Sequence, residues 1–100
     1  METTTQDEDE RTLLRGVGLR VTRPRLAVLT ALADHPHADA STVLAAVRRA
    51  LPGTSHQAVY DCLHALTEAG LVRREQRGKW AYFAVVDETL ESAAAALRGV

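Results

Sequence analysis

A short segment near the middle of the chain combines side chains that can read the edges of DNA bases. His56 and Tyr60 are four residues apart, as are Gln57 and Asp61, so in a helix the members of each pair lie one turn apart on the same face. Gln can form two hydrogen bonds with adenine, an aromatic ring can pack on a thymine methyl group, and Asp can accept a hydrogen bond from cytosine. Ser55 and the helix start that it would cap can bind a phosphate. These five residues predict a DNA-reading helix.

Two of these residues also allow other interpretations. Tyr60 could be a half-buried packing residue instead of a base contact. Asp61 repels phosphate, so its carboxylate either accepts a hydrogen bond from a base, orients a nearby arginine or belongs to a surface that binds a protein. The sequence therefore leaves two functions open: a DNA-binding regulator, and a winged-helix protein-interaction module without DNA binding.

The charged residues are distributed unevenly, although the whole chain has a net charge of only −1. Residues 1–10 contain five acidic residues and no basic one, residues 11–86 contain eleven basic and five acidic residues, and residues 87–100 contain three acidic residues and one basic. A basic segment between acidic ends is typical of a protein that binds a polyanion. A solvated surface with an acidic tail explains the same pattern, so charge alone does not decide.

Basic residues gather in two segments that would flank the DNA-reading helix. Arg20, Arg23 and Arg25 lie around the start of the second expected helix, and a glycine-containing turn between two β-like runs holds Arg77 and Lys79. A short, basic hairpin tip suits a phosphate or the minor groove. We therefore expect these five residues to contact DNA outside the major groove.

The sequence contains no pattern that predicts catalysis or insertion into a membrane. We find no Gly-rich phosphate loop, no nucleophile with a nearby base and no metal-binding cluster, so we expect no enzyme activity. No apolar run reaches the roughly 18 residues that a membrane span needs, and the acidic N-terminus does not resemble a signal peptide. The single cysteine, Cys62, fits a core position and a reducing compartment, so we expect a cytoplasmic protein.

Hydrophobic spacing and helix-ending residues predict the elements that must hold these side chains. We expect a short helix around 13–17, a second helix that Thr22 caps and His35-Pro36 ends, a third that Asp39 or Ser41 caps, and a fourth over 55–69. The runs 71–76 and 80–86 predict a β-hairpin, and 88–98 predicts a last helix. This order predicts a mainly α fold with a small β-hairpin, namely a winged helix-turn-helix plus a C-terminal helix.

The predicted elements divide the chain into three segments. Residues 1–10 lack an apolar anchor and predict a disordered acidic tail. Residues 11–86 form the expected winged-helix domain. Residues 87–100 form a C-terminal helix that either pairs with a second subunit or packs back on the first helix.

Four ordered segments carry a resemblance to a known family. They are 18–29 (GLRVTRPRLAVL), 35–39 (HPHAD), 57–61 (QAVYD) and 66–73 (LTEAGLVR). Together they resemble the ferric uptake regulator (Fur) family over about residues 12–75, and most closely its actinobacterial peroxide-responsive branch. The resemblance implies the DNA-binding winged helix of a dimeric, metal-responsive repressor. It also implies that Tyr60 contacts bases, that Arg20 lies near the minor groove and that Arg25 supports a backbone contact.

The metal site that this resemblance implies is incomplete in the sequence. His37 matches a regulatory metal ligand of the family, which implies a divalent metal. The other ligands of the family lie in a His-rich segment and Cys-x-x-Cys pairs that follow the wing, beside a dimerisation domain, and the 100 residues contain none of these. Because His35 and His37 alone make a poor closed site, loop surface or cap hydrogen bonding is the simpler interpretation. We therefore assign no cofactor.

The hairpin and the last helix resemble a second family. Residues 77–83 (RGKWAYF), followed by a helix, are similar to the arsenic-responsive repressor (ArsR) family, in which the terminal helix helps to form the dimer. The two resemblances imply a sequence-specific transcriptional regulator, a repressor, that binds a palindromic operator in double-stranded DNA as a homodimer. Half-sites about one helical turn apart are expected for such a dimer.

Overall fold

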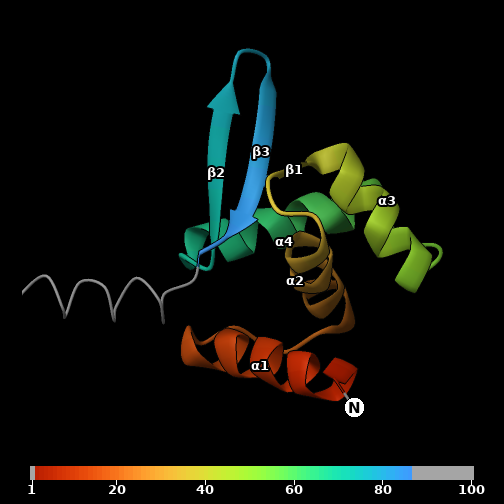
Figure 1. Cartoon of the computed structure of the whole chain (residues 1–100), viewed down its shortest axis with the longest axis vertical. Helices are drawn as coiled ribbons and strands as arrows, with labels where there is room; N and C mark the ends of the chain where they lie inside the picture. The colour runs from red at the N-terminus through yellow and green to blue at the C-terminus, as the bar shows by residue number, and fades with distance from the viewer. Residues whose placement is uncertain (1, 87–100) are drawn as a thin grey trace, which may run out of the picture.

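The computed structural model describes residues 2–86 of the chain. In chain order the elements are α1 (Glu2–Gly16), α2 (Arg23–Asp34), β1 (Ala38–Asp39), α3 (Ala40–Ala50), α4 (His56–Glu68), β2 (Val72–Arg77) and β3 (Trp80–Val85). Figure 1 shows α2, α3 and α4 grouped together, with the β2–β3 hairpin projecting at one end of the molecule and α1 at the other. The predicted winged helix-turn-helix is therefore confirmed, while the predicted C-terminal helix lies outside the described residues.

Side-chain caps begin three of the helices at the residues that the sequence indicates. The hydroxyl of Thr22 accepts a hydrogen bond from the Arg25 N–H at 3.3 Å, and the hydroxyl of Ser55 accepts one from the Ala58 N–H at 3.0 Å. Asp39, and not Ser41, caps α3. Each cap satisfies a backbone N–H that has no partner inside the helix. The Ser55 cap places the start of α4 at His56.

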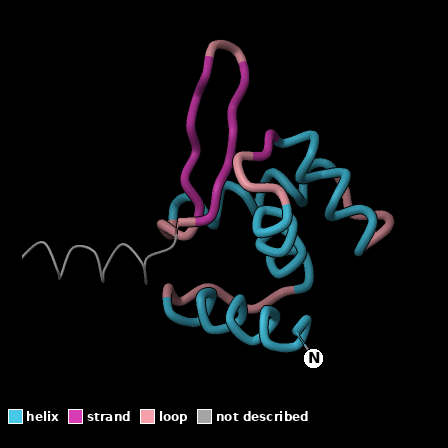
Figure 2. The backbone as a smooth tube through the Cα atoms, in the orientation of Figure 1, coloured by secondary structure: helices cyan, strands magenta, loops and turns pink. Residues whose placement is uncertain are grey.

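The three strands form one antiparallel sheet in the order β1-β3-β2. Strands β2 and β3 pair from Val72↔Val85 to Arg77↔Trp80, which makes the long hairpin drawn in Figure 2. Strand β1 adds only two pairs to β3, including Ala38↔Phe83. The sequence predicts the hairpin but not β1, because two residues are too few to show an alternating pattern.

The helices and the sheet share one hydrophobic core. The 3–4 spacing of apolar residues in α4 predicts a core-facing side, and the structure buries all four of its members: Val59, Cys62, Leu63 and Leu66. Leucines and valines of α2 and α3, with Phe83 of β3, complete the core around them. Within residues 2–86, none of the helices has both the length and the apolar character that crossing a bilayer demands.

Helix α1 corrects one prediction. Residues 1–10 are expected to be a disordered tail, but α1 already begins at Glu2. Glu10 is only 6% exposed, and its carboxylate accepts a hydrogen bond from the Thr30 hydroxyl at 2.8 Å. A buried carboxylate needs such a partner, and Leu14, one turn further on, is fully buried. The disordered-tail prediction is wrong here because the residue that holds this segment, Glu10, is polar and bonds to Thr30 of α2.

Replacement of Asp39 by Ala is expected to lower the free energy of unfolding by about 1 kcal/mol at neutral pH. The backbone N–H of Thr42 donates to the Asp39 carboxylate at 2.9 Å and lowers the pKa of Asp39 below its ordinary value of 3.8. A lowered pKa means that the stabilisation is present above that ordinary value and is lost as the pH falls through the folded-state pKa. Urea unfolding of both proteins at about pH 7 and about pH 3 measures the difference.

Asp39→Asn serves as the matched control. Asn also caps helices well but does not titrate, so this variant should lose less stability than Asp39→Ala at neutral pH. A gap between the wild-type chain and Asp39→Ala that stays constant down to the lower pH would contradict the role given to the carboxylate.

Candidate nucleic-acid interface

The exposed face of α4 carries two aromatic rings in contact. His56 and Tyr60 lie one turn apart, with ring centroids 4.7 Å apart and ring planes at 60°. Tyr60 is 44% exposed, although its neighbour Val59 is buried. The first turn of α4 therefore presents an aromatic surface away from the core, on the helix end where a recognition helix contacts bases.

Gln57 and Asp61 form a second pair on the same exposed face. The Gln57 Nε2 donates a hydrogen bond to Asp61 Oδ1 at 2.8 Å. Within residues 2–86, no arginine pairs with the Asp61 carboxylate. Asp61 instead contacts Gln57, the residue that the sequence predicts to pair with adenine.

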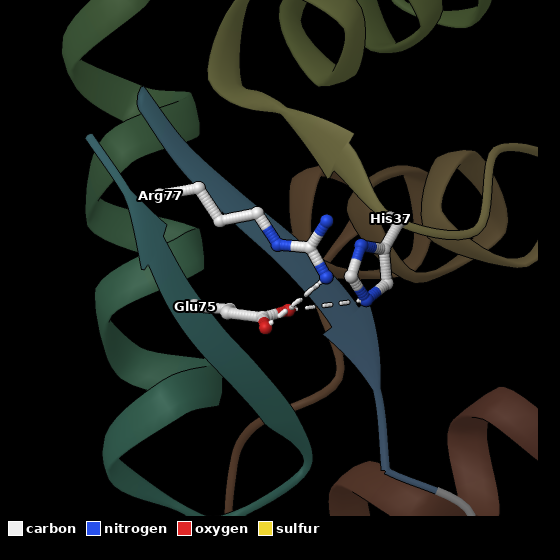
Figure 3. A network of polar contacts seen from close by, with 3 residues as sticks. All are labelled: His37, Glu75 and Arg77. Atoms are coloured by element: carbon white, nitrogen blue, oxygen red, sulfur yellow. Dashed lines mark hydrogen bonds and ion pairs between the residues drawn. The ribbon is translucent and has the colours of Figure 1, made fainter. Parts of the chain in front are cut away.

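Arg77 and Lys79 of the hairpin differ in whether an acidic side chain already pairs with their charge. The Arg77 guanidinium lies 3.3 Å from one carboxylate oxygen of Glu75, and His37 Nε2 lies 3.3 Å from the other (Figure 3). Lys79, in the turn, has its ammonium 5.9 Å from the centroid of the Trp80 ring. Lys79 is therefore the more available charge, whereas Arg77 shares its charge with Glu75.

His37 lies in the loop before β1, beside the middle of the hairpin, where Glu75 pairs with Tyr82. Its backbone φ of 62° is in the left-handed region, and its ring stacks on Tyr82 with centroids 6.2 Å apart. The ring faces Glu75, whose carboxylate also contacts the cationic Arg77. Among residues 2–86, no three side chains of the His, Cys, Asp and Glu types gather as a metal site needs. The described residues therefore do not fit a closed metal site at His37.

The three arginines around the start of α2 have different surroundings. Arg20 and Arg23 are exposed, and Arg25 is half-buried. The Arg25 guanidinium donates a hydrogen bond to the Arg20 carbonyl at 2.8 Å. Arg25 therefore braces the loop that presents Arg20, which agrees with a supporting position and leaves Arg20 and Arg23 free to meet solvent.

A hollow of about 540 Å³ lies between the start of α3, α4 and the hairpin. Tyr60 and His64 line it from α4, and Arg74, Lys79 and Trp80 line it from the hairpin. Arg74 and Trp80 are absent from the site that the sequence predicts. The alternation along β2 places Arg74 on the opposite face of the strand from Arg73 and Glu75. Trp80, the single tryptophan, follows the basic turn and is 54% exposed. An exposed tryptophan beside a basic turn is the signal that could have added it.

Cys62 and His64 do not form a reactive pair. Cys62 is buried in the core, and burial raises the pKa of its thiol. His64 is exposed and lies 3.9 Å from Glu68. The Cys62 thiol thus stays protonated near neutral pH and acts as a core side chain.

A comparison with models of protein families identifies the family of this chain. A model of the ferric uptake regulator family matches residues 16–90, which is most of the chain. The chain belongs to the ferric uptake regulator family. The match confirms the resemblance of the four segments and extends beyond them, through the hairpin, to residue 90.

Curated members of the ferric uptake regulator family are closely similar over part of their length. Ferric uptake regulation protein 1 of Mycolicibacterium fortuitum is 64% identical over 64 residues, which are 64% of this chain and 40% of that protein. Transcriptional regulator FurA of Mycobacterium bovis is 67% identical over 63 residues, which are 63% of this chain and 43% of that protein. The chain thus spans less than half of the length of these relatives.

Solved structures of ferric uptake regulators share the fold. The regulator from Pseudomonas aeruginosa, solved with manganese, has a TM-score of 0.70 and 34% identity, covering 78% of this chain and 60% of that one. The regulator from Vibrio cholerae has a TM-score of 0.69 and 26% identity, covering 76% of this chain and 60% of that one. The winged helix of this chain is therefore the fold of its family.

Proposed function

We propose that the chain is a sequence-specific DNA-binding transcriptional regulator that represses transcription by binding a palindromic operator as a dimer. The exposed face of α4 carries this proposal, because Tyr60 and His56 form an aromatic surface at the start of a capped helix. The relatives named as transcriptional regulators and ferric uptake regulation proteins support it. The proposal gives the chain a binding role in the cytoplasm and no catalytic step.

In the proposed complex, α4 lies in the major groove with its first turn nearest the bases. Gln57 and Tyr60 are the proposed base contacts, and Ser55 binds a phosphate at the start of the helix. Its hydroxyl accepts from the Ala58 N–H, so its own hydrogen remains available to donate to a phosphate oxygen. Lys79 and Arg77 contact the backbone or minor groove from the hairpin, and Arg20 from the loop before α2.

The experiment that tests the proposal uses the full 100-residue chain and labelled duplex DNA. Duplexes of about 30 base pairs, long enough for two half-sites one helical turn apart, are enriched from a random-sequence pool. Binding of an enriched duplex is then followed by fluorescence anisotropy at several salt concentrations. Emission of Trp80, the single tryptophan, reports independently on the hairpin.

A regulator is expected to enrich a palindromic sequence and to bind it in a salt-dependent manner. Two chains per duplex, measured by solution mass, are expected for the dimer. Failure to enrich any sequence, with no binding at low salt, would contradict the proposal and favour a protein-interaction module.

Replacement of both Arg77 and Lys79 by Ala is expected to weaken binding to all duplexes and to flatten its dependence on salt. Each lost phosphate contact reduces the slope of log K against log salt by about 0.9. Because Arg77 already pairs with Glu75, most of the effect should come from Lys79. Anisotropy titrations on enriched and unrelated duplexes measure both slopes.

The matched control exchanges the two basic residues, Arg77→Lys with Lys79→Arg, and so keeps both charges. This variant should retain the wild-type slope. An unchanged slope in the double alanine variant would show that the hairpin does not contact the phosphates.

A further inference from the structure

Asp61 is an acidic residue on the α4 surface that is proposed to face DNA. Its carboxylate is exposed on the face that also carries Gln57 and Tyr60, where it repels the phosphates of any bound duplex. A negative charge at this place weakens binding unless another effect offsets it. Within residues 2–86, the side-chain contact that the structure gives Asp61 is the hydrogen bond from Gln57, which points to an offsetting effect through that side chain.

The hydrogen bond determines which way the Gln57 amide faces. An ionised carboxylate only accepts hydrogen bonds, so the amide must turn its nitrogen, and not its oxygen, toward Asp61. Without that partner, an exposed glutamine amide can present either orientation. The distance of 2.8 Å and the one-turn spacing on α4 are those of a well-formed helix-surface pair.

The orientation leaves Gln57 with the groups that adenine recognition needs. The amide nitrogen has two N–H groups, of which Asp61 takes one. The remaining N–H and the amide oxygen can pair with adenine N7 and with the adenine N6 amino group in the major groove. The opposite orientation of the amide would place a donor against the amino group and an acceptor against N7, and both contacts would be lost.

We infer that Asp61 is a positioning residue that orients Gln57 to read an adenine of the operator. This inference rests on the proposed function. Asp61 acts through Gln57 and has two opposite effects on binding. Its charge lowers the affinity for every duplex, and its hydrogen bond raises the preference for adenine at one position of each half-site.

The experiment replaces operator adenines one at a time by 7-deazaadenine, in which a carbon replaces N7 and the base-pairing edge is kept. The operator is a duplex that the full wild-type chain enriches from a random pool. Affinities of the wild-type chain, Gln57→Ala, Asp61→Ala and the double variant are measured on each duplex and on one unrelated duplex. Circular dichroism melting curves confirm that each variant is folded.

For the wild-type chain, we expect one adenine per half-site at which 7-deazaadenine lowers the affinity about tenfold. Gln57→Ala should show no such loss, and Asp61→Ala should show a loss of only about threefold. In the Gln57→Ala background, removal of Asp61 should leave the discrimination unchanged. Asp61→Ala should bind the unrelated duplex more tightly than the wild-type chain, because a negative charge has been removed.

Asp61→Asn separates the charge from the hydrogen bond. This variant removes the charge but keeps an oxygen that can accept from Gln57, so it should show a larger 7-deazaadenine loss than Asp61→Ala. Equal losses in the two variants would overturn the inference, because the charge alone would then account for the effect.

Other outcomes distinguish the inference from the proposed function. A tenfold loss that persists in Asp61→Ala, or an effect of Asp61 on the 7-deazaadenine discrimination that remains in the Gln57→Ala background, would overturn the inference alone. A preference for cytosine that disappears in Asp61→Ala would show that Asp61 reads a base directly and would also overturn it. Failure of the wild-type chain to bind any duplex would overturn the proposed function together with the inference.

Discussion

Replacement of Tyr60 by Ala is expected to weaken binding to the enriched operator by roughly 1–3 kcal/mol, which is about fivefold to 150-fold. The Tyr60 ring is 44% exposed and its closest ring partner, His56, is itself on the surface. The substitution therefore removes a surface contact and leaves the core of α4 intact. Anisotropy titrations on the operator and on an unrelated duplex measure the change.

The loss should be confined to the operator. Because a base contact contributes to specificity, affinity for the unrelated duplex should stay close to that of the wild-type chain. Tyr60→Phe, which keeps the ring that packs on a thymine methyl group, should retain most of the operator affinity. Equal weakening on both duplexes would assign Tyr60 to the backbone, and no weakening on either would remove it from the interface.

Replacement of Leu66 by Ala is expected to lower the free energy of unfolding by about 2–5 kcal/mol. Leu66 is fully buried on the core side of α4, where the helix meets α2 and the sheet. The lost methyl groups leave a cavity that the surrounding side chains can fill only in part. Since small domains have about 5–15 kcal/mol of stability in total, a measurable fraction of the chain should unfold on mild heating.

Urea unfolding followed by circular dichroism measures this effect. Leu66→Met keeps the side-chain volume and should cost less than about 1.5 kcal/mol. Both variants keep every residue of the proposed interface, so at low temperature the folded fraction should bind the operator normally. A loss for Leu66→Ala as small as that for Leu66→Met would contradict the packing described for α4.

The sequence predicts the elements that depend on local patterns, and misses those that depend on distant partners. The caps Thr22 and Ser55 and the core side of α4 follow from residue types and helical spacing, and the structure confirms them. The extent of α1 could not be predicted, because Glu10 is held by Thr30, twenty residues away. The two-residue strand β1 exists only through its pairing with β3.

The candidate site was predicted in the same uneven way. The exposed face of α4 follows from the helical period alone. The pairing of Gln57 with Asp61 is compatible with their spacing, but so are other contacts, and only rotamers in the folded chain select it. Arg77 was predicted to contact DNA from the hairpin turn, and the structure pairs its guanidinium with Glu75, whose carboxylate also contacts His37. The neighbours that reduce the availability of a charge come from other segments, and sequence spacing does not reveal them.

The position of α1 gives the domain an electric dipole. From residue 8 onward the helix carries three acidic and two basic side chains, whereas the β2–β3 hairpin carries one acidic and four basic ones. These elements lie at opposite ends of the long axis in Figure 1, and the contact between Glu10 and Thr30 ties α1 to α2. The field of any polyanion therefore exerts a torque that turns the hairpin toward it before contact. Such pre-orientation raises the rate of productive encounters, and added salt removes it.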